Sequence, residues 1–295
     1  MAILVDRNTR VLIQGITGKA GNAFSRQILE ASPALLVAGV TPGRAGQNVQ
    51  GIPVYGFVAD AVEARGANLA LICVPAMHFK DAAIEAIDAG IECIVAYIEG
   101  VPIHDAIVCA AHARRNRAIL VGPNTAGIMS PLFGAVGELR ANAAPAKPGR
   151  LGIVTKSGSI ALDTMELTAV VEGQSTVVCL GGDEVVGASF SEILLRFEND
   201  PDTDAIVMIG EVGGRDEAMA ADVVAGMKKP VVAYVSGHTA PPGQKMGHAG
   251  ALISAGYESA GAKSDVLRRA GALVAPTLPE IVPLLQSALA SCSRP

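Results

Sequence analysis

Tryptophan is absent from this sequence of 295 residues, and aromatic residues make up only 3% of it. Half of the residues are hydrophobic, with Ala, Val, Ile, Leu and Gly supplying the apolar mass, which suits parallel sheets covered by alanine-rich helices. No apolar run is long enough for a membrane span, because glycine, proline or a charge interrupts each one, so we expect no membrane partner. The opening MAILVDRNTRVLIQG lacks the basic and apolar regions of a signal peptide and predicts a strand.

Cysteine is scarce, and its spacing follows neither a metal-binding nor a disulfide pattern. The five residues are odd in number, show no C-x-x-C pair and lie mostly in apolar runs; they are Cys73, Cys93, Cys109, Cys179 and Cys292. We therefore expect reduced, buried thiols in a protein of the cytosol or a matrix compartment, with a cytoplasmic location favoured. A net charge of −5 argues against a nucleic-acid partner.

Segments typical of buried parallel strands recur along the chain: RVLIQG, LLVAGVTP, LALICVP, CIVAYIEG, AILVGPN, RLGIVTKSG, TVVCLGG, AIVMIGE, PVVAYVSG and ALVAP. Helical patterns with apolar residues three and four positions apart separate most of them, such as FSRQILEA and FKDAAIEAIDAG. This alternation predicts an α/β fold with doubly wound parallel sheets. The rhythm breaks between Asn124 and Arg150, in a stretch rich in Pro and Ala, so we divide the chain into domains at residues 1–124 and 125–295.

The stretch RVLIQGITGKAGNAFSRQIL has the order strand, glycine loop, helix. Gly15, Gly18 and Gly21 permit a tight turn that brings backbone N–H groups close to a phosphate at the helix N-terminus. The next strand ends in GVTPGRAG, where Arg44 stands near the place of the carboxylate that NAD enzymes carry. A cation there fits a phosphorylated ribose, which both CoA and NADP possess. For the loop taken alone, a purely structural turn is the alternative.

In the second half, His248 lies in the small-residue segment TAPPGQKMGHAGALI. Most lone histidines are surface or satisfied core residues, which is how we interpret the other four, His78, His104, His112 and His238. Two loops favour a functional role for His248. The loop KSGS at 156–159 precedes a helix whose N–H groups would face an anion, and Glu211 ends a strand in a glycine turn, where its carboxylate could accept a ring N–H of an imidazole. If these loops converge, they form a phosphohistidine site.

Ordered motifs along almost the whole chain now point to one family. They include QGITGKAG, GVTPGRAG, IEGVP, GPNTAG, GIVTKSGS, GGDEVVGASF, AIVMIGEVGG and TAPPGQKMGHAGALI. With them the chain resembles the α subunit of succinyl-CoA synthetase and its relatives, malate–CoA ligase and the small subunit of citryl-CoA synthetase. The resemblance implies a Rossmann-like CoA-binding domain followed by a flavodoxin-like ligase domain.

The resemblance also assigns roles to residues of this chain. It implies that His248 carries the phosphoryl group and that Glu211 supports it. It implies that Ser157, Gly158 and Ser159 begin the helix that receives the phosphohistidine. The residues that it implies for CoA are Thr17, Gly18, Lys19, Ala20, Arg44, Tyr97, Ile98 and Glu99.

The departures from the family pattern fall near the organic acid. Thr125 replaces the usual cysteine in GPNTAG, Leu162 replaces a substrate-contacting tyrosine, and GAVGELRANAAPAKPG replaces a basic stretch. Thr125 and Leu162 are therefore our candidate substrate residues, and we expect a small carboxylic acid other than succinate.

Members of this family need ATP or GTP with Mg²⁺, and this chain has neither a Walker A sequence nor a candidate ATP-grasp domain. The resemblance therefore implies a β subunit with the nucleotide site, in an αβ or α₂β₂ assembly, and no metal ligand in this chain. Two readings from other classes stay open: a non-catalytic CoA-binding regulator, and an NAD(P)-dependent dehydrogenase, which the missing acidic residue near Arg44 disfavours. Within the family, a citryl-CoA- or malyl-CoA-forming subunit is the alternative.

Overall fold

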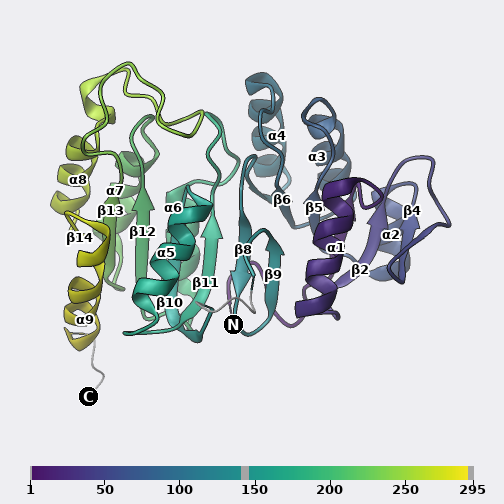
Figure 1. The fold of residues 1–295 in the computed structure, drawn as a ribbon, viewed down its shortest axis with the longest axis horizontal. Helices are drawn as coiled ribbons and strands as arrows, with labels where there is room; N and C mark the ends of the chain where they lie inside the picture. The colour runs from purple at the N-terminus through teal and green to yellow at the C-terminus, as the bar shows by residue number, and fades with distance from the viewer. Residues whose placement is uncertain (1, 141–145, 292–295) are drawn as a thin grey trace.

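A computed structural model describes residues 2–140 and 146–291, and Cys292 lies outside them. The chain forms two seven-stranded sheets that lie side by side, each flanked by helices (Figure 1). The last strand of the first sheet ends at Val121, and the first strand of the second begins at Gly127. The sheets are therefore formed by consecutive halves of the chain, each with its own buried apolar residues.

The first sheet has the strand order β3-β4-β2-β1-β5-β6-β7. Its strands are β1 (Val11–Gln14), β2 (Leu36–Val40), β3 (Asn48–Val49), β4 (Ile52–Tyr55), β5 (Leu69–Ile72), β6 (Cys93–Ala96) and β7 (Ile119–Val121). Its helices are α1 (Lys19–Ala31), α2 (Val58–Arg65), α3 (Phe79–Asp88) and α4 (Ile103–Arg115). Apart from β3, which pairs antiparallel with β4, the strands are parallel in the order of a Rossmann fold.

The second sheet has the order β14-β13-β12-β10-β11-β8-β9. Its strands are β8 (Gly127–Ser130), β9 (Gly134–Gly137), β10 (Pro148–Thr155), β11 (Gln174–Cys179), β12 (Ala205–Gly210), β13 (Val231–Val235) and β14 (Leu273–Val274). Its helices are α5 (Gly158–Thr168), α6 (Phe190–Asn199), α7 (Asp216–Gly226), α8 (Ala260–Arg269) and α9 (Ile281–Ser291). Leaving β8 and β9 aside, the order is that of a flavodoxin-like sheet, as the family resemblance implied.

One part of the second sheet differs from a purely parallel pattern. Strands β8 and β9 form a hairpin that pairs antiparallel with β11, in the region where the strand–helix rhythm breaks. The hairpin lies against the first domain, because Gln27 on α1 donates from Nε2 to the carbonyl of Gly137 at 2.9 Å. A hairpin needs no crossover helix, so these short segments carry no helical period.

The core follows from the residue types of the strands and helices. Every residue of β12 is buried, and α6 buries Phe190, Ile193, Leu194 and Phe197 at spacings of three and four. Ser189 caps α6 by accepting a hydrogen bond from the amide of Glu192. A fully apolar strand covered by one helix face is the pattern that parallel sheets require.

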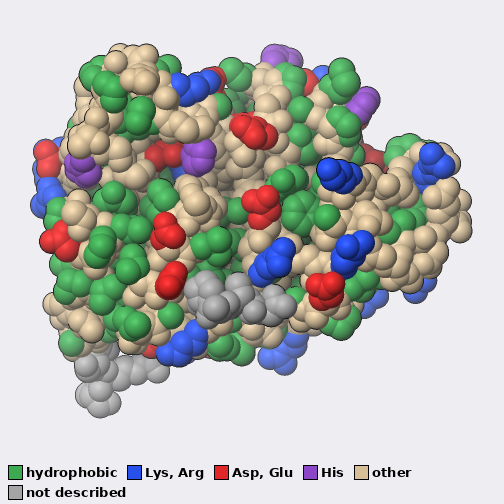
Figure 2. Space-filling model, viewed as in Figure 1, with side chains coloured by type: hydrophobic (Ala, Val, Ile, Leu, Met, Phe, Trp, Pro, Cys, Tyr) green, Lys and Arg blue, Asp and Glu red, His purple; other side chains and the backbone are tan. Residues whose placement is uncertain are grey.

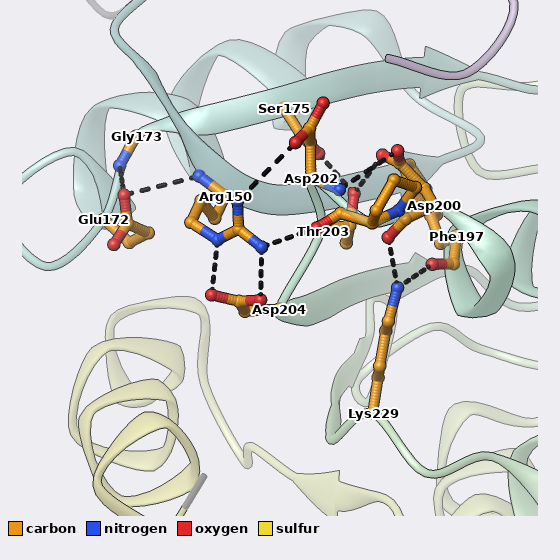
Figure 3. A network of polar contacts seen from close by, with 11 residues as sticks. Arg150, Glu172, Gly173, Ser175, Phe197, Asp200, Asp202, Thr203, Asp204 and Lys229 are labelled. Atoms are coloured by element: carbon orange, nitrogen blue, oxygen red, sulfur yellow. Dashed lines mark hydrogen bonds and ion pairs between the residues drawn. The ribbon is translucent and has the colours of Figure 1, made fainter. Parts of the chain in front are cut away.

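A polar network fastens the amino ends of β10 and β12 (Figure 3). Arg150 on β10 donates to both carboxylate oxygens of Asp204, at 2.5 and 2.8 Å, and to the carbonyl of Pro201 at 2.6 Å. The hydroxyl of Thr203 donates to Asp200 at 2.7 Å. These contacts hold the amino ends of β10 and β12 together. The loops that could bind a ligand follow the carboxyl ends of the same strands, at the other edge of the sheet.

The surface mixes charges and apolar side chains. Figure 2 shows acidic and basic side chains interspersed among apolar ones across one face. No helix in the described ranges is both long and apolar enough to cross a membrane. The four described cysteines carry free thiols, and burial raises the pKa of Cys93 and Cys179 to about 12.

Candidate active site

Two neighbouring strands of the second sheet, β10 and β12, end side by side and lead to the site. The chain continues from β10 to β11 on one side and from β12 to β13 on the other, so the pair marks the point where the strand order reverses. Ligands of doubly wound sheets bind outside the carboxyl ends of strands at this point. The segment 156–158 follows β10, and Glu211 follows β12.

The long loop between β13 and α8, residues 236–259, contains His248 and passes over these strand ends (Figure 1). An isolated antiparallel bridge joins Lys245 to Leu252, which places His248 at the tip of a tight turn. Gly247 adopts the left-handed φ of 82° that this turn requires. The amide of Gly250 donates to the carbonyl of Gly182 at 3.1 Å, so a second loop supports the turn.

His248 and Glu211, 37 residues apart in sequence, meet at the centre of the site. Nδ1 of His248 lies 2.7 Å from Oε2 of Glu211. In the neutral ring, Nδ1–H donates to the Glu211 carboxylate and Nε2 keeps its lone pair. This hydrogen bond holds the pKa of His248 above its ordinary value of 6.5, against the opposing effects of burial and of the Lys156 cation.

The N-terminus of α5 lies at the same place. Ser157 occupies the N-cap position without a side-chain capping bond, and its hydroxyl lies 3.1 Å from the hydroxyl of Ser159. Thr155 holds the turn, because its hydroxyl accepts the amide of Ser157 at 3.1 Å. With Gly158 at its first position, α5 offers backbone N–H groups and two hydroxyls to an anion.

A cavity of about 500 Å³ joins these groups. Its lining includes His248 together with Lys156, Ser157, Gly158, Ser159, Leu162, Thr125, Tyr97 and Glu99. Tyr97 and Glu99 follow β6 of the first sheet, while the other residues in that list belong to the second half of the chain. The cavity therefore lies between the two halves, and residues of both can contact one ligand.

The two candidate substrate residues occupy different positions in this cavity. Leu162, on the second turn of α5, is 42% exposed and presents an apolar side chain to the opening. Thr125 is buried, and its hydroxyl donates to the carbonyl of Cys179 and accepts the amide of Gly127. The Thr125 hydroxyl is thus engaged by the backbone, whereas Leu162 is available to a ligand.

A second cavity, of about 700 Å³, opens at the glycine loop of the first sheet. Thr17 and Gly18 line it, together with Thr41 and Phe57 from the neighbouring loops. Gly21 is needed here for space, since a Cβ at this position would lie 2.3 Å from the carbonyl oxygen of Gly15. The tight turn places the N-terminus of α1 beside this largely apolar cavity, which suits a nucleotide with a phosphate.

The remaining residues implied for CoA are not among the lining residues of either cavity. Lys19 and Ala20 begin α1, and Arg44 is exposed in the turn after β2. Ile98 is buried between Tyr97 and Glu99. Of the residues implied for CoA, the structure brings Thr17 and Gly18 to the glycine-loop cavity and Tyr97 and Glu99 to the His248 cavity.

Several residues near the site were assigned no role from the sequence. Lys156 lines the His248 cavity, Gly182 supports the His248 turn, and Glu217 and Lys263 form an ion pair beneath Glu211. Lys263 lies in AGAKSDVLRR, which has the composition of an exposed helix, and a buried charge pair leaves no local pattern. The glycine doublet in GGDEVV was the one available signal for Gly182.

Two family models match the chain. The model of the CoA binding domain matches residues 6–100, and the model of the CoA-ligase family matches residues 154–273. The first covers the glycine loop, and the second covers α5, Glu211 and His248.

Curated relatives match over nearly the full length. Subunit alpha 2 of the ADP-forming succinate–CoA ligase of Archaeoglobus fulgidus is 45% identical over 98% of this chain and 100% of its own length. The subunit SqwL of an ADP-forming sulfoacetate–CoA ligase from an Acholeplasma species is 40% identical over 93% of this chain and 94% of its own. The ATP citrate lyase of Methanothrix soehngenii, solved with citrate and coenzyme A, superposes with a TM-score of 0.88 at 27% identity, over 99% of this chain and 52% of the lyase chain.

Proposed function

The chain belongs to the family of α subunits of ADP-forming succinate–CoA ligases, and from this premise we propose that it passes a phosphoryl group through His248 to a small carboxylic acid, which is then joined to CoA. One observation carries the proposal. The free Nε2 of His248, whose other nitrogen is held by Glu211, shares a cavity with the N-terminus of α5. A fixed imidazole beside an anion-binding helix end is what a phosphohistidine requires.

The first step places the phosphoryl group on His248. The lone pair of Nε2 attacks the γ-phosphorus of a nucleoside triphosphate, the bond to the diphosphate oxygen breaks, and the diphosphate leaves. Nδ1 keeps its proton, so the phosphorylated ring is cationic, and the Glu211 carboxylate at 2.7 Å balances that charge. The N–H groups of α5 and the hydroxyls of Ser157 and Ser159 neutralise the phosphoryl oxygens.

In the second step an oxygen of the acid attacks phosphorus, the N–P bond breaks, and His248 returns to its neutral form. The residues present fit CoA as the next reactant, because the glycine-loop cavity of about 700 Å³ combines an apolar lining with a helix N-terminus. CoA supplies the thiol that takes the acyl group and releases phosphate. Tyr97 and Glu99, on the loop after β6, lie where the two halves of the chain share a ligand cavity.

The nucleotide and Mg²⁺ are assigned to a partner β subunit. Relatives of the chain are named as alpha subunits of ADP-forming ligases, and the similar ATP citrate lyase chain is about twice as long as this one, since the match covers 52% of it. Within the described residues, no group of three or more His, Cys, Asp or Glu side chains is arranged to hold a metal ion. An αβ or α₂β₂ assembly, in which His248 reaches a nucleotide site on the partner, completes the proposal. A cytoplasmic location is part of it.

The test is phosphorylation of the chain by ATP or GTP in the presence of its β subunit. The wild-type protein is expected to form an acid-labile, base-stable phosphoprotein, with the ³¹P signal of a histidine phosphorylated at Nε2. His248→Asn should abolish the signal. His238→Asn is the matched control, because His238 is an exposed residue of the same loop. Phosphorylation of the His248→Asn variant would overturn the role of His248, and a wild-type chain that is not phosphorylated would favour a CoA-binding regulator.

A further inference from the structure

Beneath Glu211 lies an ion pair that the phosphoryl chemistry has not yet used. Glu217, in the first turn of α7, and Lys263, in the first turn of α8, have side chains with no exposed surface. Nζ of Lys263 lies 2.5 Å from Oε2 of Glu217. It also donates to the carbonyl of Glu211 at 2.8 Å and to that of Gly213. All three N–H donors of this ammonium group are therefore occupied.

Glu217 also binds both elements of the active site with its other carboxylate oxygen. Oε1 accepts the backbone amide of Glu211 at 3.0 Å, and Nζ of Lys156 lies 3.9 Å from the same oxygen. Lys156 precedes the N-terminus of α5 and lines the His248 cavity. One buried carboxylate thus connects the turn that carries Glu211 with the loop that begins α5.

A glycine at the end of β12 makes room for the Glu217 side chain. A Cβ at Gly210 would lie 2.6 Å from Cγ of Glu217, so only glycine permits the side chain to lie against the end of β12. Burial opposes ionisation of Glu217, but Lys156 and Lys263 outweigh it and lower the pKa of the carboxyl. The Glu217 carboxyl therefore ionises more readily than a free one, while burial lowers the pKa of Lys263.

We propose that Glu217, held by Lys263, is a positioning residue for phosphoryl transfer: it fixes the turn that directs Glu211 at His248 and anchors Lys156 under the His248 cavity. The inference rests on the proposed function. Lys156, which is 13% exposed at its side chain, then supplies positive charge to the floor of the phosphoryl site. Glu217 itself touches no substrate and acts through Glu211 and Lys156.

Stability alone does not account for an ion pair at this place. Desolvation makes a buried pair costly, and apolar residues of similar volume often replace one without loss of stability. Here the pair lies directly under the site, and each of its contacts outside the pair is made to Glu211, Gly213 or Lys156. The arrangement sets the geometry of the His248–Glu211 hydrogen bond.

The first test reads the imidazole itself and needs no partner subunit. In the full-length chain labelled with [¹⁵N]histidine, at a pH where His248 is neutral, the ring should be the Nδ1–H tautomer. The double variant Glu217→Gln/Lys263→Met removes both charges of the pair at once and leaves Lys156 with the carboxylates of Asp216 and Glu211 nearby. It should show a mixture of tautomers at His248. An unchanged tautomer would overturn the proposal, whether or not the chain has the proposed function.

The second test measures phosphorylation with the β subunit present. The double variant should form phosphohistidine roughly 10–100-fold more slowly, as is typical when a group that orients a functional side chain is lost. Its Kd for CoA should stay within about twofold, because CoA binding is assigned mainly to the first domain. A wild-type rate in this variant would show that the pair is only structural.

A matched control separates positioning from loss of stability. Arg150 lies near the amino end of β10, and Lys156 follows the carboxyl end of the same strand. At about 3.3 Å per residue the two positions are roughly 20 Å apart. Arg150→Met removes the ion pair with Asp204 (Figure 3) and destabilises the same domain. It should leave the phosphorylation rate of the folded protein and the tautomer of His248 unchanged.

If the double variant is too unstable to study, Gly210→Ala, which displaces Glu217 while keeping both charges, should give the same slow phosphorylation. A normal rate in Gly210→Ala would count against the proposal.

Discussion

Gly182 lies against the imidazole ring of His248: a Cβ on Gly182 would lie 2.7 Å from Cγ of the ring and 3.0 Å from Nδ1. No real Cβ makes such a contact, so the absence of a side chain at this position is what permits the ring to reach Glu211. The loop after β11 therefore forms one wall of the site.

Gly182→Ala is the most direct test of this wall. The added methyl group should push the ring away from Glu211 and slow phosphohistidine formation roughly 100-fold, the cost of a misplacement of about 1 Å. Single-turnover phosphorylation measures the effect, with CoA binding as the internal check. Gly261→Ala is the control, because Gly261 is an exposed helical residue and a Cβ added there would have open space around it. Equal rates for the two variants would show that the ring contact is unimportant.

Glu211→Gln should slow phosphohistidine formation roughly 10–100-fold, since an amide can hold the ring but cannot balance the positive charge of the phosphorylated imidazole. The Kd for CoA should be unchanged, because the glycine loop lies on the other sheet. Rapid quenching of the phosphorylation reaction and calorimetry measure the two quantities. A wild-type phosphorylation rate would exclude Glu211 as the orienting group.

The pH dependence of stability should report the same hydrogen bond. The pKa of His248 is raised by Glu211, and secondarily by Glu99, while burial and Lys156 lower it. The bond therefore stabilises the folded state fully below the ordinary value of 6.5, and the effect is lost as the pH rises through the raised pKa. The difference in unfolding free energy between wild type and Glu211→Gln should decrease over that interval. Urea denaturation at a series of pH values measures it, and a difference that does not change with pH would contradict the expectation.

Arg44→Ala tests recognition of the phosphate on the ribose of CoA. Arg44 is exposed in the turn after β2, so we expect a contribution of about 1 kcal/mol, or roughly fivefold in Kd, instead of the larger value of a shielded pair. The wild-type chain should bind CoA more tightly than dephospho-CoA, and Arg44→Ala should remove most of that difference. Arg269→Ala, at the exposed end of α8, is the control. If calorimetry gives the wild-type chain the same affinity for CoA and dephospho-CoA, Arg44 does not recognise the phosphate on the ribose.

Leu162 should determine which acid the enzyme prefers. Its apolar side chain at the cavity opening offers no hydrogen bond to a second carboxylate. Leu162→Tyr adds a hydroxyl and should raise kcat/KM for succinate by roughly 5–10-fold, the effect of one net hydrogen bond. The assay compares succinate, malate, citrate and other small acids with the reconstituted complex. If succinate already has the highest kcat/KM in the wild type, the substitution at this position has no bearing on specificity.

Much of the fold could be predicted because its signals are local. Strands that are buried on both faces form continuous apolar runs, as in AIVMIG, and α6 shows its buried face directly in its spacing of apolar residues. The hairpin β8–β9 was not predicted, because its glycines are selected by contacts with the opposite strand of the hairpin, which leave no periodic pattern in the sequence. A Cβ at Gly127, for example, would lie 1.9 Å from the carbonyl oxygen of Val136.

The site shows the same limit. The sequence singled out His248, Glu211 and the start of α5 because their loops follow strands or lie among small residues. Lys263 could not be found in this way, since its buried position depends on α7 and α8 packing together. Glu217 looks like an ordinary acidic residue in the first turn of a helix, where the helix dipole favours it. Only the tertiary structure shows that it accepts the amide of Glu211.

The position of the His248 cavity between the two halves of the chain has a consequence for how such enzymes diversify. The groups proposed for phosphoryl transfer are fixed to β10, β12 and the loop after β13, and the glycine loop belongs to the other sheet. Leu162, on α5, and Glu138, just after β9, line the cavity without joining the described hydrogen bonds of His248. We therefore expect substitutions at Leu162 and Glu138 to change the accepted acid without disturbing the His248–Glu211 hydrogen bond.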